Sequence, residues 1–123
     1  MDGWTAHPRA WPPARLPELG LLLPDLHQAT AGYVPPAGAI SRPWFGRRLG
    51  TGPRLIGHRD VAPWNVLARD PTGMALIDWE AAGPVDPLVE LAQACWLNAQ
   101  LHDDDVAATH HLASRHSAPV MPD

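Results

Sequence analysis

Three side chains in the middle of the chain carry the kinds of oxygen atoms that phosphoryl transfer needs. Asp60 lies two residues after His58. Asn65 follows Asp60 by five residues and precedes Asp78 by thirteen. Phosphoryl transfer needs a carboxylate that orients and deprotonates the accepting hydroxyl, and hard oxygen ligands for the Mg²⁺ that bridges the nucleotide phosphates. Asp60 suits the first role, and Asn65 together with Asp78 suits the second.

Two short apolar segments are predicted to bring these side chains together. Residues 65–68 (NVLA) and 74–78 (MALID) are typical of strands, and the residues between them (RDPTG) have the composition of a turn. A hairpin of these strands would place Asn65 and Asp78 at its open end. A further strand is predicted over residues 54–58 (RLIGH), which lead into the loop of Asp60.

Helices are predicted on both sides of the hairpin. Residues 18–31 have leucines at helical spacing, but Pro24 interrupts them. This pattern predicts either a kinked helix or one that begins near the proline. Asp86 is a good N-cap and is followed by a proline that fits the first helical position, so a second helix should run to about Leu101. Its apolar residues are predicted to form one core-facing side. They are Leu88, Leu91, Ala92, Cys95, Trp96 and Ala99.

We therefore predict a single α+β domain in which a catalytic β-hairpin is flanked by helices. Residues 1–17 are rich in proline and predict an irregular lead-in. The domain should cover residues 18–113, with its catalytic core at 54–101, and residues 114–123 should form a frayed tail. The acidic run Asp103 to Asp105 predicts the start of a last helix, because acids favour a helix N-terminus.

Composition narrows the class of protein. The chain has 123 residues, which suits one modest domain, and a net charge of −4 with histidine neutral. Nucleic-acid binding needs a basic face, so we expect no nucleic-acid partner. The apolar run Leu19 to Leu23 is far too short to span a bilayer, so we expect no membrane partner. The single cysteine, Cys95, cannot form an internal disulfide and suits a reducing, cytoplasmic location.

The stretch from Leu55 to Leu97 resembles the aminoglycoside phosphotransferase and choline kinase-like families, which share the protein-kinase fold. Their catalytic loop usually reads H-G-D-x-x-x-x-N, the next strand ends in I-D-W/F-E, and G-x-x-D-P-x-x-D-L-A follows. The corresponding residues here read HRDVAPWN, IDWE and GPVDPLVELA. The second and third motifs favour a small-molecule phosphotransferase, because a protein kinase would show D-F-G followed by A-P-E.

The resemblance implies a partial C-terminal lobe of the protein-kinase-like fold. It also implies transfer of the γ-phosphoryl group of ATP, with Mg²⁺, to a hydroxyl of a small molecule. Carried over by position, Asp60 would be the catalytic base, and Asn65 and Asp78 would bind Mg²⁺ and so the nucleotide. Structural support would come from His58, Arg59 and Asp86. Two residues depart from the family pattern. Arg59 replaces the glycine that the family usually has at this position, and Glu90 replaces the commoner aspartate.

We expect the N-terminal lobe of such an enzyme to be missing from these residues. That lobe carries a phosphate-covering loop and a lysine that pairs with the α- and β-phosphates. The chain has no lysine, and its nearest glycine-rich stretch, residues 46–52, has the wrong spacing and suits a plain loop. Two hypotheses follow. Either the chain is a phosphotransferase that acts weakly or works with a separate N-lobe polypeptide, or it is a truncated, inactive remnant that folds and binds metal or a partner.

Other features have simpler explanations. His102, His110, His111 and His116 surround the acidic run, but no spacing matches a known zinc site, so we favour solvated surface. The acidic run could attract a cationic acceptor, but we favour a helix start as its role. The acceptor stays open among aminoglycosides, choline-like alcohols, sugars and macrolides. A hydrophobic surface left by a missing lobe could also drive self-association.

Overall fold

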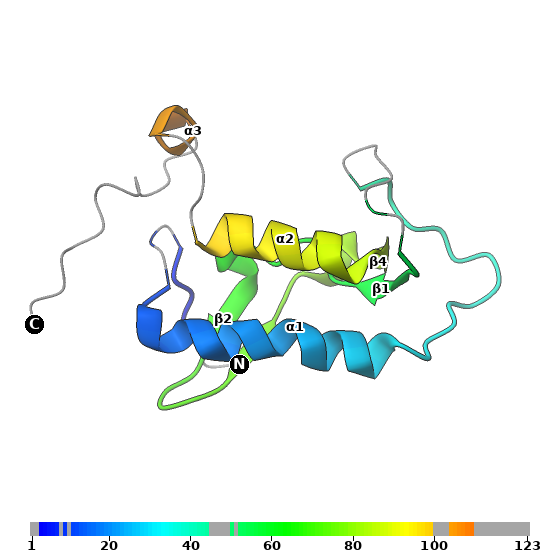
Figure 1. Cartoon of the computed structure of the whole chain (residues 1–123), viewed down its shortest axis with the longest axis horizontal. Helices are drawn as coiled ribbons and strands as arrows, with labels where there is room; N and C mark the ends of the chain where they lie inside the picture. The colour runs from blue at the N-terminus through cyan, green and yellow to red at the C-terminus, as the bar shows by residue number, and fades with distance from the viewer. Residues whose placement is uncertain are drawn as a thin grey trace, which may run out of the picture.

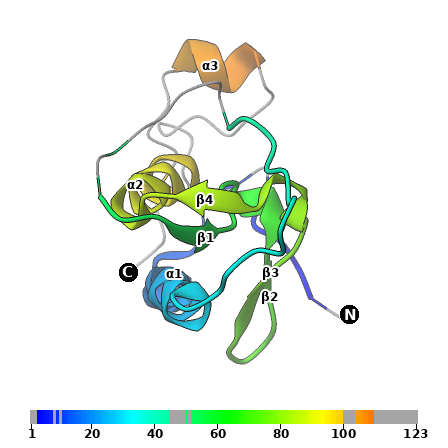
Figure 2. The same cartoon turned by 90° about the vertical axis from the view of Figure 1, so that its right-hand side faces the viewer.

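Two helices lie side by side, and two small antiparallel sheets lie next to them (Figures 1 and 2). The computed structural model describes residues 3–7, 9, 11–44, 50, 52–99 and 104–109. The helices are α1 (Leu16–Thr30) and α2 (Pro87–Asn98), and a short helix α3 (Asp104–Thr109) follows. The strands are β1 (Leu55–Gly57), β2 (Val66–Ala68), β3 (Met74–Leu76) and β4 (Gly83–Val85). The predicted α+β class is confirmed.

The predicted hairpin is present. β2 and β3 pair antiparallel, with Val66 opposite Leu76. The turn between them closes with a hydrogen bond from the Arg69 amide to the Gly73 carbonyl at 2.9 Å. At the open end the Ile77 amide donates to the Asn65 carbonyl at 3.0 Å, so the pairing continues beyond the strands toward the candidate site.

The strand predicted before His58 forms as β1, but its partner β4 was not predicted. β1 and β4 pair antiparallel, with Gly57 opposite Gly83. Sequence patterns do not reveal β4, because it contains a glycine and Pro84, which are both disfavoured in strands. Pairing with β1 brings the residues just after Asp78 back against the loop that begins at His58.

Helix α1 begins earlier than either sequence-based expectation. It starts at Leu16 with Pro17 in its first turn, where a missing N–H costs nothing, and it continues through Pro24. The alternative of a helix beginning near Pro24 is therefore wrong. Leu19 and Leu23 are buried in the hydrophobic core, so this side of α1 faces the rest of the protein.

The proline-rich lead-in contributes to the core instead of lying apart from it. Three residues of it form a 3₁₀ turn, Pro13–Arg15. Trp4 exchanges two backbone hydrogen bonds with Ala68, at 3.0 and 2.8 Å, and so extends the hairpin sheet by one bridge. The Trp11 side chain is buried, and its indole N–H donates to Asn98 Oδ1 at 3.0 Å. Irregular backbone thus supplies a core side chain that periodicity could not reveal.

Helix α2 begins as predicted but presents the other side to the core. Asp86 caps it by accepting a hydrogen bond from the Leu88 amide at 2.9 Å, and Pro87 takes the first position. The buried residues are Glu90, Ala94 and Asn98. The predicted core-facing side is exposed, so its assignment was wrong, and so was the burial of Trp96, which is 51% exposed.

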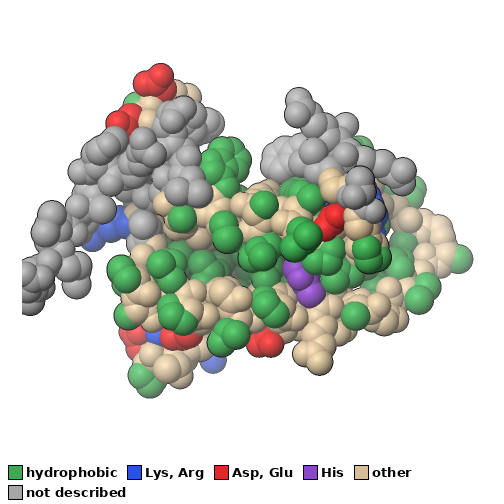
Figure 3. All heavy atoms as spheres, viewed as in Figure 1, with side chains coloured by type: hydrophobic (Ala, Val, Ile, Leu, Met, Phe, Trp, Pro, Cys, Tyr) green, Lys and Arg blue, Asp and Glu red, His purple; other side chains and the backbone are tan. Residues whose placement is uncertain are grey.

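The polar side of α2 faces the core because its side chains form hydrogen bonds to buried backbone groups of other segments. Asn98 Nδ2 donates to the Val61 carbonyl at 2.6 Å and also accepts the Trp11 indole through its oxygen. Polar residues that satisfy buried backbone groups can outrank apolar residues at a packed surface. Hydrophobic side chains consequently gather on the outer face over α1 and α2 (Figure 3). On α2 the exposed large ones are Leu88, Leu91 and Trp96.

Candidate active site

His58 connects the two segments that carry the candidate chemistry. It is fully buried, and its Nε2 atom lies 2.8 Å from the Ile77 carbonyl, one residue before Asp78. Its Nδ1 atom accepts the Asp60 amide at 3.3 Å. A carbonyl can only accept, so Nε2 carries the proton and Nδ1 is the acceptor. The ring of Trp79 packs edge-on against the imidazole at 4.7 Å.

Asp60 and Asn65 face each other across the loop. Asn65 Nδ2 donates to the Asp60 carboxylate at 2.8 Å and to the Asp60 backbone carbonyl at 3.0 Å. Asn65 is buried at the end of the 3₁₀ turn Pro63–Asn65, which Pro63 starts. Both of these hydrogen bonds use the amide nitrogen, so neither uses the amide oxygen.

Asp78 lies just after β3 in a backbone conformation that few residues adopt. Its φ of 60° and ψ of 69° are left-handed, and its side chain is exposed. Aspartate tolerates this region better than most residues but still at some cost. The conformation turns the chain from β3 into the 3₁₀ turn Trp79–Ala81.

The environment of Asp60 changes its acidity. Partial burial raises the pKa of the Asp60 carboxyl above its ordinary value, and the negative charge of Asp78 raises it further. The neighbouring His58 and the hydrogen bond from Asn65 act in the opposite direction. The backbone of Ile77, directly before Asp78, bonds to the Asn65 carbonyl at 3.0 Å and to the His58 ring at 2.8 Å, so the end of the hairpin lies against the loop of Asp60. The structure therefore gathers the three residues singled out from the sequence.

Asp86 supports this region from the start of α2. Besides capping the helix, its Oδ2 atom accepts the Gly52 amide at 2.9 Å. These backbone hydrogen bonds, from Gly52 first and from Leu88 next, hold the pKa of the Asp86 carboxyl below its ordinary value. Gly50 lies close by with a φ of 77°, and a Cβ atom there would come within 2.3 Å of the same carboxylate oxygen.

Several sequence-based predictions fall outside the described residues. The four histidines at 102, 110, 111 and 116 do, as does most of the glycine-rich stretch 46–52. Among the residues that the structure does describe, no three His, Cys, Asp or Glu side chains gather as a metal-binding group. The helices in that part of the chain lack the length and hydrophobicity that a bilayer-spanning helix requires.

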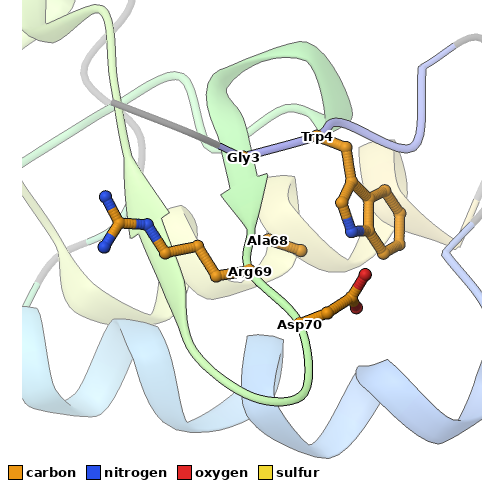
Figure 4. Close-up of a pocket in the computed structure, with 5 residues that line it drawn as sticks. All are labelled: Gly3, Trp4, Ala68, Arg69 and Asp70. Carbon is orange, nitrogen blue, oxygen red and sulfur yellow. The ribbon is translucent and has the colours of Figure 1, made fainter.

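A surface hollow lies at the opposite end of the hairpin from Asp60. Its volume is about 520 Å³, and it is lined by Gly3, Trp4, Ala68, Arg69 and Asp70. Figure 4 shows the Trp4 indole and the Asp70 carboxylate on one side of the strand and the Arg69 guanidinium on the other. The hollow shares no residue with the candidate site.

A protein-family model described as "Phosphotransferase enzyme family" matches residues 2–120. The chain belongs to this phosphotransferase family. It is also 50% identical over 114 residues to the trifolitoxin immunity protein of Rhizobium leguminosarum bv. trifolii. The match covers 93% of this chain but 44% of the relative, so the chain spans less than half of the relative's length. No solved structure matches the chain significantly.

The structure shows how the chain accommodates the two residues that depart from the family motifs, Arg59 and Glu90. Arg59, at the usual glycine, has a φ of 65°, a left-handed conformation that glycine adopts without strain. The backbone here has therefore kept the glycine-like conformation although the residue is an arginine. Its side chain is buried, which lowers the pKa of Arg59, although the negative charge of Glu90 partly offsets this.

Glu90, which replaces the aspartate that is commoner in the family, is fully buried. It forms hydrogen bonds to the loop of Asp60 and to α1. Its Oε1 atom accepts the Arg59 backbone amide at 2.5 Å. Its Oε2 atom lies 2.6 Å from Nε2 of His27 in α1. Gly57 leaves room for this carboxylate, since a Cβ atom there would lie 2.4 Å from Oε2. Sequence reasoning did not identify this contact. The available signal was an acidic residue four positions after the N-cap, away from the apolar side of the helix.

The donor set at the site fits a magnesium ion. Mg²⁺ prefers hard oxygen ligands and commonly takes one or two carboxylates. Asp78 offers an exposed carboxylate, and Asn65 turns its amide nitrogen to Asp60, which leaves its oxygen for a cation. These two residues would hold the ion.

Proposed function

We propose that this chain supplies the catalytic base and metal ligands of a phosphotransferase that moves the γ-phosphoryl group of ATP to a hydroxyl of a small molecule. The observation that carries the proposal is the orientation of Asn65. Its nitrogen donates to the Asp60 carboxylate at 2.8 Å, and its backbone carbonyl accepts the Ile77 amide, next to Asp78, at 3.0 Å.

Each residue then has a defined part in the reaction. Asp60 accepts the proton of the substrate hydroxyl while the hydroxyl oxygen attacks the γ-phosphorus. The bond from that phosphorus to the bridging oxygen breaks, and ADP leaves with the electron pair. Mg²⁺ bound by Asn65 and Asp78 would neutralise charge on the phosphates. Burial of Asp60 helps, because a carboxylate with a raised pKa is a stronger base.

We further propose that the fold is part of a kinase-like C-terminal lobe. The order of helix, strand, loop, hairpin and capped helix supports this assignment. The cation that pairs with the α- and β-phosphates would come from outside these 123 residues, which contain no lysine. A separate N-lobe polypeptide, or further residues of a longer chain, would supply it.

The test is ATP turnover over a panel of hydroxylated acceptors, with wild type compared with Asp60→Ala. Removal of a general base typically lowers the rate by about 10² to 10⁴. Asp70→Ala is the matched control, because this aspartate is exposed in the hairpin turn, away from the site. Turnover above background in wild type and in the control, but not in Asp60→Ala, is expected. Equal rates in all three proteins would refute a catalytic role.

The relative's name supports a biological role. Because the relative is a trifolitoxin immunity protein and is 50% identical, we propose that this chain also protects cells against a toxin. The alternative function, an inactive protein that protects by binding, makes a different prediction. If cells expressing Asp60→Ala survive trifolitoxin as well as cells expressing wild type, protection does not use phosphoryl transfer. Loss of protection at equal expression supports the enzyme.

A further inference from the structure

Arg59 has an unfavourable backbone conformation for its residue type. Its φ is 65°, and its side chain is buried, with 5% of the residue exposed. A left-handed conformation costs an L-residue energy that glycine would not pay. Burial of a guanidinium is also costly unless its N–H groups are bonded. Contacts of the Arg59 side chain must offset both costs.

Those contacts join the catalytic loop to the segment that follows Asp78. The Arg59 Nε atom donates to the Ala81 carbonyl at 2.6 Å. Ala81 ends the 3₁₀ turn that begins directly after Asp78. The Nη2 atom donates to the Arg42 carbonyl, also at 2.6 Å. Hydrogen bonds from a charged donor are about twice as strong as neutral ones. The same residue is held by Glu90 through its backbone amide.

Gly83 is shaped to this guanidinium. A Cβ atom on Gly83 would lie 2.9 Å from both Cζ and Nη1 of Arg59, and 3.1 Å from Cβ of Ser41. The glycine of the family's G-x-x-D-P motif is thus, in this chain, the floor against which Arg59 packs. A Cβ atom at position 83 would therefore push against the guanidinium, whose Nε atom bonds to the Ala81 carbonyl.

We propose that Arg59 is a positioning residue, which fixes the turn after Asp78 against the loop of Asp60 and so sets the placement of the two carboxylates. This inference rests on the proposed function only in that the two carboxylates are taken to be the base and a metal ligand. The tie itself is a property of the fold. In this chain the arginine does by hydrogen bonding what a glycine at the same position could not do.

The test compares Arg59→Gly with Gly83→Ala and the double variant. The readout is hydrogen exchange of the Ala82 amide, which donates to the Trp79 carbonyl at 3.0 Å inside the turn. Arg59→Gly relieves the backbone conformation but removes the tie, so exchange at Ala82 should quicken about tenfold. Ala92 in α2 serves as the internal reference. Arg59→Lys keeps one charged donor and should restore part of the protection.

Gly83→Ala should also quicken exchange at Ala82 in the wild-type background. It should have much less effect when Arg59 is already glycine, because the clash is mainly with the guanidinium. Glu80→Gln is the surface control. Glu80 lies on the same turn and forms an exposed ion pair with Arg42. Loss of this pair should leave the exchange rate of the Ala82 amide unchanged.

The same proteins are titrated with Mn²⁺ as a probe of the metal site, and Arg59→Gly is expected to bind it about tenfold more weakly. Unchanged exchange at Ala82 in Arg59→Gly overturns the positioning role whatever the metal result. Altered exchange with unaltered Mn²⁺ affinity overturns it too, because the carboxylates would then not depend on the tie. If wild type binds no Mn²⁺ while Ala82 responds as expected, the proposed metal site fails and the tie stands.

Discussion

Residues with costly local features cluster around Asp60. Arg59 and Asp78 both have left-handed backbone, and Glu90 is a fully buried carboxylate. Such features persist only where surrounding contacts hold them, and they concentrate at functional sites. Here the contacts are hydrogen bonds between side chains and backbone, from His58 to Ile77 and from Arg59 to Ala81 and Glu90. Polar contacts therefore support the candidate site alongside the buried apolar residues Val61, Ala62 and Val66.

Removal of the Glu90 carboxylate should be strongly destabilising. Glu90→Leu leaves the buried Arg59 amide and the partly buried His27 ring without their acceptor, which should cost about 1–3 kcal/mol or more. Glu90→Gln keeps an oxygen for the amide and should cost about half as much or less. Urea unfolding measures both. Similar losses in the two variants would show that the charge, and not the acceptor, matters.

Asp86 should make stability depend on pH in the acidic range. Its pKa is lowered in the folded state, so its contribution is complete above the ordinary pKa of about 3.9 and is lost as pH falls through the folded value. Asp86→Asn keeps a capping oxygen but cannot titrate. The gap in unfolding free energy between wild type and Asp86→Asn should narrow as pH falls from 6 to below about 4. A constant gap would mean that capping geometry accounts for the whole effect.

At the scale of elements, the hairpin and the cap of α2 could be predicted because local signals determine them. Turn composition separates β2 from β3, and Asp86-Pro87 defines a helix start. The strand β4 and the buried side of α2 could not be predicted. Both depend on partners distant in sequence: β4 needs β1, and Asn98 needs the Val61 carbonyl. Apolar periodicity located the helix α2 but assigned its two sides the wrong way round.

Truncation of one buried and one exposed leucine should show that the apolar side of α2 does not support the fold. Leu23 in α1 is 2% exposed, whereas Leu88 in α2 is 75% exposed. Leu23→Ala should cost about 2–5 kcal/mol because it empties a core position. Leu88→Ala should stay within about 0.5 kcal/mol. Thermal or urea unfolding distinguishes the two, and a large loss from Leu88→Ala would mean that α2 packs through its apolar side after all.

For the molecule as a whole, local contacts could be predicted from the sequence better than contacts between distant segments, and the catalytic and metal-binding roles stay predictions. The spacing of Asp60, Asn65 and Asp78 identified residues that the fold brings together. The anchoring contacts of Glu90 and Arg59 could not be read from spacing, since they join α1, α2 and the loop in three dimensions. The described residues thus hold Asp60 and Asn65 in hydrogen-bond contact, with Asp78 at the end of the same hairpin, and we propose that these three act as base and metal ligands. In the proposed enzyme, a lysine that pairs with the α- and β-phosphates is not among these 123 residues.

The most direct test of this account is the affinity for Mn²⁺, displaceable by Mg²⁺, in wild type and Asp78→Gly. Glycine removes the carboxylate and relieves the left-handed φ of 60°, so stability should be equal or up to about 1 kcal/mol higher. The account predicts that wild type binds the ion and that the stable, folded Asp78→Gly protein binds it at least about tenfold more weakly. Equal affinity in the two proteins, or no binding by wild type, would contradict it.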